Sequence, residues 1–136
     1  MTIVVDASVT MAWCFEDEAT AATDAVLDQL RNDEAAVPAL WQLEVINVVL
    51  GAQRRGRLTE AQATRFLGLL GQLPIRVDTL PVDVHEVHAV AARHGLTAYG
   101  AAYLVLAERL SAPLATLDEP LAAAARNAGV TLLIAG

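Results

Sequence analysis

The sequence has 136 residues, of which 55% are hydrophobic, and its mean hydropathy is +0.44. This size and composition predict one globular domain over residues 1–136 rather than a disordered tail or a multidomain assembly. Sixteen acidic residues outnumber nine basic ones, which are all Arg, so the formal net charge is -7. That charge opposes general adhesion to nucleic acid or anionic lipid, and the absence of Lys excludes P-loop kinases and Schiff-base enzymes.

Cysteine usage and the first residues predict a cytoplasmic protein. The single cysteine, Cys14, cannot form a disulfide within the chain, and residues 1–6 hold neither a basic start nor an apolar signal core. The apolar runs are shorter than the ~20 residues that cross a bilayer, so we expect no membrane partner.

The first part of the chain alternates predicted strands and helices. A short β-branched strand stops at Asp6, and Ser8 is a plausible N-cap for the helix that follows. Apolar residues at helical spacing, with acids between them, predict a second, amphipathic helix before a brief second strand. In chain order these elements are expected at Thr2–Val5, Ser8 through Trp13, Glu18–Asn32 and Ala36–Pro38.

The next predicted helix, Leu40–Arg55, is apolar nearly all round. A helix that faces water on one side carries a polar stripe, which this segment lacks. We expect the helix to be covered by the core and by a partner.

Caps and turn residues delimit the remaining elements. Thr59 with Gln62 resembles a capping box, Thr97 is a further N-cap, and Gly95 and Gly129 end their helices as left-handed caps. The strands are expected at Ile75–Val77, Leu114–Leu117 and Val130–Ile134, and the helices from Thr59 to the Gly71–Pro74 break and over Val82–His94, Ala98–Leu110 and Leu121–Ala128.

Short apolar strands that alternate with helices are typical of a parallel sheet covered on both faces. We therefore predict an α/β protein, a three-layer α/β/α sandwich with a central, mostly parallel sheet of about five strands. In such sheets, ligands bind at the carboxyl ends of the strands, near the point where the strand order reverses. Asp6 and Asp118 each follow a predicted strand and are candidates for such a site.

Other polar residues join these two acids. Thr116 precedes Asp118 by two residues and shares its face of the strand. Glu44 lies inside the apolar helix, where an unpaired buried charge is costly, and Asn47 lies on the same helical face. Each acid also has a structural interpretation: Asp6 as a turn or cap residue, and Glu44 as a residue that points to solvent or binds an Arg.

Carboxylates that converge without Lys or Arg among them repel one another and raise one another's pKa. A hard divalent cation with oxygen ligands, Mg²⁺ or Mn²⁺, relieves that repulsion. A metal held in this way polarises a phosphodiester and activates water, so it also allows an acidic protein to act on nucleic acid.

Four segments, in order, resemble the signatures of PIN-domain proteins, and the size and element order resemble the VapC-type toxins of toxin–antitoxin pairs. The segments are Ile3-Val4-Val5-Asp6-Ala7-Ser8, Glu44-Val45-Ile46-Asn47, Gly95 through Tyr103, and Leu114-Ala115-Thr116-Leu117-Asp118. The resemblance implies a PIN-like fold and a Mg²⁺- or Mn²⁺-dependent endoribonuclease that hydrolyses RNA. It also implies a homodimer and a VapB-like antitoxin whose C-terminal segment inserts toward the acidic pocket.

The resemblance further implies roles for individual residues. Asp6, Glu44 and Asp118 are implied as the catalytic, metal-binding acids, with Asp118 acting through water. The implied supporting polar groups are Ser8, Asn47 and Thr116.

The sequence departs from the family pattern at position 100, where PIN domains of this type have an acidic metal ligand and this chain has Gly100. Local propensity does not favour Gly there, because Gly costs up to ~1 kcal/mol relative to Ala in a helix and an acid would complement the dipole. Gly100 is either an inactivating change, natural or introduced, or the mark of a diverged member. We expect this chain to cleave RNA poorly or not at all. On the same predicted helix, Tyr99 and Tyr103 are expected to pack together in the core or at the pocket edge.

Weaker candidates have simpler structural interpretations. Arg54, Arg55 and Arg57 match the dipole at the end of the apolar helix, with an RNA or antitoxin contact as the alternative. His85 and His88 are three residues apart but lack a third ligand, so we expect them on an exposed helix surface.

Two other functions are open. The first is a catalytically dead PIN-like module that only binds an antitoxin partner, which Gly100 supports and which a metal titration would distinguish. The second is a phosphoaspartyl or receiver-like domain that uses Asp6, but such domains use a second adjacent acid and a Lys, and this chain has no Lys.

Overall fold

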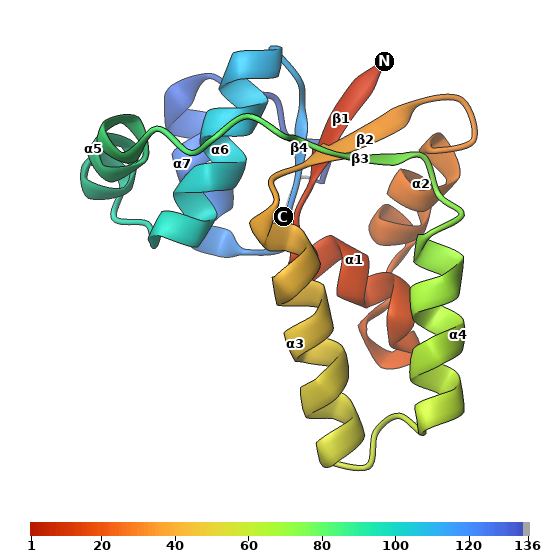
Figure 1. The fold of residues 1–136 in the computed structure, drawn as a ribbon. Helices are drawn as coiled ribbons and strands as arrows, with labels where there is room; N and C mark the ends of the chain where they lie inside the picture. Colours follow the sequence, from red (N-terminus) through yellow and green to blue (C-terminus); the bar gives the residue numbers. More distant parts are fainter. Residues whose placement is uncertain (135–136) are drawn as a thin grey trace.

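The computed structural model describes residues 1–134, so Ala135 and Gly136, the last residues of the predicted domain, lie outside the described range. Within that range four strands form one parallel sheet in the order β3-β2-β1-β4 (Figure 1). This confirms the predicted α/β class and the parallel sheet. The strands are β1 (Thr2–Val5), β2 (Glu34–Val37), β3 (Ile75–Val77) and β4 (Leu114–Ala115).

The predicted fifth strand, Val130–Ile134, is wrong. This segment pairs with the sheet only through an isolated parallel bridge between Leu114 and Leu132, although Ile134 packs in the same hydrophobic cluster as Ile3 and Val5. The physical reason is the length of its neighbour: β4 has two residues, because the chain leaves the sheet directly after Ala115. A ladder cannot extend beside a strand that has already ended, so a single bridge is all that forms.

Seven α-helices and one 3₁₀ helix are present in residues 1–134. Thr59 and Gln62 form the predicted capping box, Thr97 caps α6, and Gly95 and Gly129 adopt left-handed C-cap conformations with φ of 66° and 78°. The helices are α1 (Ala7–Cys14), η1 (Glu16–Glu18), α2 (Ala21–Gln29), α3 (Leu40–Arg54), α4 (Glu60–Leu70), α5 (Val84–His94), α6 (Ala98–Leu110) and α7 (Glu119–Ala128).

Two predictions near the N-terminus need correction. Ser8 is not the N-cap of the first helix; Asp6 is, because its backbone is extended and its side chain accepts the N–H of Val9. The amphipathic helix expected over residues 18–32 is shorter, since Thr20 forms a capping box with Thr23 and starts α2 at Ala21.

The sheet is the middle of three layers. Along β1, Val4 faces a cluster formed with α3, α6 and α7, while Ile3 and Val5 face a second cluster formed with α2. This alternation follows from the period of two along a strand. In Figure 1, α5, α6 and α7 gather on one side of the sheet, whereas α3 and α4 extend from its lower end.

The apolar helix α3 is covered on one side only. Trp41, Val45 and Val49 are buried in the core, but Leu43 and Ile46 are 67% and 42% exposed. The core therefore covers one side of α3, as predicted. The other side, which we expected a partner to cover, is an apolar face on the surface. No helix within residues 1–134 has the length and apolar character needed to cross a bilayer.

Candidate active site

The candidate site lies at the carboxyl edge of the sheet, between β1 and β4. These strands are parallel neighbours with Val5 beside Ala115, so the chain segments that follow them, at Asp6 and Thr116, leave the sheet side by side. The next strands in sequence, β2 and β3, continue on the other side of β1. The strand order therefore reverses between β1 and β4, which is where ligands bind in sheets of this kind.

Asp6 occupies the centre of this edge and is buried, with 4% of its surface exposed. One carboxylate oxygen, Oδ1, accepts the hydroxyl of Ser8 at 2.6 Å and the backbone N–H of Val9 at 3.1 Å. The other oxygen, Oδ2, accepts the hydroxyl of Thr116. Both oxygens are thus held by hydroxyl donors, and the helix cap supplies a further donor.

Backbone groups of the segment after β4 orient the two hydroxyls. The Oγ of Ser8 accepts the N–H of Leu117 at 2.9 Å, and the Oγ1 of Thr116 accepts the N–H of Asp118 at 3.0 Å. Each hydroxyl accepts an amide proton and donates its own proton to Asp6, because an ionised carboxylate only accepts hydrogen bonds. The predicted supporting residues Ser8 and Thr116 both contact Asp6 directly.

The surroundings of Asp6 disfavour its charge. Burial raises the pKa of Asp6 above its usual value. The hydrogen bonds from Ser8, Thr116 and Val9 lower this pKa, and the charge of Asp118 raises it by a smaller amount. No Arg in the described part of the chain forms an ion pair with Asp6. A bound cation would relieve this cost.

Asp118 lies at the exposed margin of the same edge. It is the N-cap of α7, and its Oδ1 accepts the N–H of Leu121 at 3.1 Å. Its second carboxylate oxygen is not used by that cap. The charge of Asp118 acts on Asp6, although Asp118 itself is exposed.

Glu44 reaches the site from α3, on another side of the edge. It is half-buried, and its Oε1 accepts the hydroxyl of Tyr103 at 2.6 Å. Tyr103, on α6, thus supplies the partner that the sequence required for Glu44. Burial, and then the hydrogen bond and charge of Glu44, raise the pKa of Tyr103 well above its usual range, with a further contribution from the charge of Asp6.

Sequence reasoning missed the contact between Tyr103 and Glu44. The expectation that Tyr99 and Tyr103 pack together is wrong, because Tyr99 is 63% exposed whereas Tyr103 is 3% exposed. The sequence did contain a signal for Tyr103. It lies three residues after position 100, and residues three apart on a helix share a face. Asn47, a predicted supporting group, is exposed, so its role stays a prediction.

The remaining candidates lie away from this edge or serve the fold. His85 and His88 are both exposed on α5. Arg54 lies in the last turn of α3, and Arg57 pairs with Asp17 at 3.0 Å. Neither set adds a metal ligand to the site.

Gly100 is at the start of α6, where its N–H donates to the Oγ1 of Thr97 at 3.1 Å. A Cβ added at Gly100 would stand 3.6 Å from that oxygen and 3.9 Å from the Cβ of Leu96, which are ordinary contacts. The backbone therefore has room for an acidic side chain at this position, and the fold itself does not demand glycine.

The side chains at this edge are of the type that binds a hard divalent cation, but they are too few to hold one by themselves. Asp6, Glu44 and Asp118 offer only carboxylate oxygens, the ligands that Mg²⁺ and Mn²⁺ prefer. Within residues 1–134, however, no three His, Cys, Asp or Glu side chains are close enough to hold a metal ion by themselves. The chemistry of the set thus fits a cation, but the three acids do not form a complete metal-binding group by themselves.

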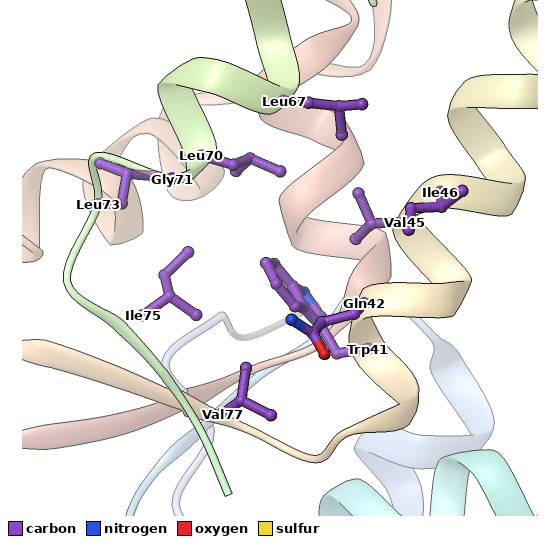
Figure 2. A pocket seen from close by; sticks show the side chains of 10 residues that line it. All are labelled: Trp41, Gln42, Val45, Ile46, Leu67, Leu70, Gly71, Leu73, Ile75 and Val77. Atoms are coloured by element: carbon purple, nitrogen blue, oxygen red, sulfur yellow. The ribbon is translucent and has the colours of Figure 1, made fainter. Parts of the chain in front are cut away.

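An apolar cavity of about 280 Å³ lies apart from the acidic residues, between α3, α4 and the edge strand β3. Figure 2 shows Trp41 and Val45 from α3 facing Leu67 and Leu70 from α4 across it. Its lining contains none of the candidate acids. This cavity suits an apolar side chain of a partner better than a charged substrate.

Comparison with known proteins agrees with this architecture. The family model of the PIN domain matches residues 3–127. The curated protein "Ribonuclease VapC3" from Pyrobaculum aerophilum is 33% identical over 124 residues, which cover 90% of this chain and 93% of that protein.

Solved structures show the same fold. The crystal structure of PAE2754 from Pyrobaculum aerophilum superposes with a TM-score of 0.72 at 28% identity, covering 91% of this chain and 84% of that one. VapBC2 from Rickettsia felis, solved bound to a DNA fragment from its promoter, gives a TM-score of 0.64 at 12% identity and covers 97% of both chains. At such low identity the second likeness concerns the fold alone.

Proposed function

The chain belongs to the PIN domain family, and from this premise we propose that it is an endoribonuclease toxin of a VapBC-type pair that uses Mg²⁺ or Mn²⁺ to hydrolyse RNA phosphodiester bonds. The likeness to a VapC ribonuclease over 90% of the chain supports the class of reaction. The acidic residues at the carboxyl edge of the sheet support this edge as the location of the reaction.

One observation carries the proposal. Asp6 is a buried carboxylate at the point where the strand order reverses, with Glu44 and Asp118 at the same edge, and none of the three forms an ion pair within residues 1–134. A helix cap at position 6 does not by itself require two more acids at the same edge. Uncompensated acids of this kind are typical of cation-dependent sites.

The chain's own residues prepare the site for a cation. Asp6, Glu44 and Asp118 would hold the ion, and the ion when bound would polarise a phosphodiester oxygen and lower the pKa of water. Ser8 and Thr116 keep the Asp6 carboxylate in one orientation by donating to both of its oxygens. Holding a ligand in this way is the usual function of hydrogen-bonding groups behind a metal site.

We propose that Gly100 weakens this nuclease. The three acids do not form a complete metal-binding group, and the position that would add a ligand carries no side chain. Loss of a group that merely supports a ligand costs ~10–100-fold in affinity or activity, so loss of a ligand costs at least that much.

Cleavage of RNA by three full-length proteins tests the proposal: this chain, Gly100→Asp and Gly100→Ala. The Ala variant is the matched control, because it removes glycine's backbone freedom without adding an acid. Gly100→Asp should cleave RNA with Mn²⁺ or Mg²⁺ and stop with EDTA, while the other two cleave at least ~10-fold more slowly. Equal cleavage by all three would reject the role of position 100.

We also propose a VapB-like antitoxin as the partner, and a homodimer as the assembly. The exposed apolar face of α3 and the cavity beside it provide a surface that a partner would cover. Proteins of this fold have been solved as toxin–antitoxin complexes, including one from Klebsiella pneumoniae. Light scattering of the purified chain tests the dimer.

A catalytically dead module that only binds an antitoxin is the second candidate, and Gly100 is the feature that favours it. A Mn²⁺ titration of this chain separates the two. Saturable Mn²⁺ binding that is lost in Asp6→Asn supports a nuclease with a weakened site, and no binding even at millimolar Mn²⁺ supports the dead module.

A further inference from the structure

The contact between Tyr103 and Glu44 joins two helices that are far apart in the sequence. Glu44 is on α3 and Tyr103 is on α6, and the hydroxyl of Tyr103 donates to Glu44 Oε1 at 2.6 Å. The two residues are 59 positions apart. The bond therefore exists only because the tertiary fold places α3 and α6 together at the carboxyl edge.

The two partners differ in mobility. The Tyr103 ring is 3% exposed and packs within the main hydrophobic core, so its hydroxyl has a nearly fixed position. Glu44 is half-buried on a surface helix and has three rotatable side-chain bonds. The hydrogen bond therefore restricts the position of the Glu44 carboxylate, while the Tyr103 hydroxyl is already held by the core.

Tyr103 is related to both acids. Its hydroxyl contacts Glu44 directly, and the charge of Asp6 acts on it as well. Its hydroxyl proton is donated to Glu44. It also lies three residues after Gly100 on α6, so the two positions share a helical face.

We propose that Tyr103 is a positioning residue that holds the Glu44 carboxylate beside Asp6, so that both acids act on one divalent cation. This inference rests on the proposed metal-dependent function. Tyr103 uses its single proton on Glu44 and does not itself bind the cation. The remaining oxygen of Glu44 is left for the metal, in the manner of a ligand oriented by a hydrogen-bonding neighbour.

The test measures Mn²⁺ affinity by calorimetry in the Gly100→Asp protein, which carries an acid at position 100. Tyr103→Phe removes only the hydroxyl, and Tyr99→Phe is the matched control, since Tyr99 is four residues earlier on α6 and exposed. Tyr103→Phe should weaken Mn²⁺ binding by ~10-fold or more, and Tyr99→Phe should leave it within about twofold.

Removing Glu44 distinguishes positioning from a general structural effect. In a Glu44→Ala background, Tyr103→Phe should change Mn²⁺ affinity by less than about twofold, because the group on which it acts is gone. An equal loss in both backgrounds overturns the proposal, since Tyr103 would then act on the fold and not on Glu44. Unchanged affinity of Tyr103→Phe in the first background overturns it as well.

Thermal unfolding of each variant shows whether it is folded. Should Tyr103→Phe fail to fold, Glu44→Asp breaks the same contact, because its shorter side chain cannot bring the carboxylate to the hydroxyl. Glu44→Asp should lose Mn²⁺ affinity to a similar degree. Unchanged Mn²⁺ affinity overturns the proposal. A Gly100→Asp parent that binds no Mn²⁺ rejects the metal site and the role of Tyr103 together. A parent that binds, with Tyr103→Phe unaffected, rejects only the role of Tyr103.

Discussion

The hydroxyl of Thr116 donates to the Oδ2 of Asp6 from a position 110 residues later in the chain. The same hydroxyl accepts the N–H of Asp118 at 3.0 Å. Thr116 therefore connects the buried acid at the end of β1 with the segment that carries the exposed acid after β4. Both residues depend on the parallel pairing of β1 with β4.

Replacing Thr116 should expose how much Asp6 depends on this hydroxyl. Thr116→Val keeps the shape but leaves Asp6 Oδ2 and the N–H of Asp118 without their partner. We expect a loss of about 1–3 kcal/mol in the free energy of unfolding at neutral pH, measured by urea denaturation. Thr116→Ser, which keeps the hydroxyl, is the control and should lose less. A Val variant as stable as the Ser variant would contradict the importance of the bond.

Asp6→Asn should stabilise the metal-free protein, and the gain should depend on pH. Burial raises the pKa of Asp6, so the folded state binds that proton more tightly than the unfolded chain does. The contribution of Asp6 to stability is therefore complete below its unfolded pKa and is lost as the pH rises through its higher folded pKa.

Asn is an equally good N-cap and has no such dependence. The stability advantage of Asp6→Asn over the parent should widen as the pH rises from about 4 toward 7, as followed by thermal denaturation in EDTA. An advantage that narrows over this range would show that the hydrogen bonds to Asp6 outweigh its burial.

Restoring an acid at position 100 should make the stability of the fold respond to metal. A ligand that binds only the folded state stabilises it by about 2.7 kcal/mol at 100 times its dissociation constant. We expect Mn²⁺ to raise the melting temperature of Gly100→Asp clearly more than that of Gly100→Ala or of this chain. Identical shifts in the three proteins would mean that position 100 does not contact the metal.

A charge on the exposed apolar face of α3 should prevent antitoxin binding without unfolding the protein. Ile46 is 42% exposed and lines the apolar cavity, so Ile46→Arg places a charge where an apolar partner would dock. Thr64→Arg, on the exposed side of α4, is the matched control. Co-purification with a VapB-like antitoxin should fail for Ile46→Arg and succeed for Thr64→Arg. Retention of the antitoxin by both would place its binding surface elsewhere.

Local signals in the sequence were sufficient for most elements. The capping box at Thr59 and the left-handed caps at Gly95 and Gly129 were predicted correctly, because each depends on a few consecutive residues. Ser8 was misassigned for a related reason: an acid and a hydroxyl two residues apart both suit an N-cap, and propensity does not rank them. In the structure Asp6 is the cap, and Ser8 donates to it.

The sequence by itself determined the class of fold, the acids at the strand ends and the family, since hydrophobic periodicity and ordered motifs are properties of neighbouring residues. Only the tertiary structure decided which distant residues the acids contact. Thr116 reaches Asp6, and Tyr103 reaches Glu44, across 110 and 59 residues. Spacing along a chain does not predict such contacts, because they form only when separate strands and helices pack on one another.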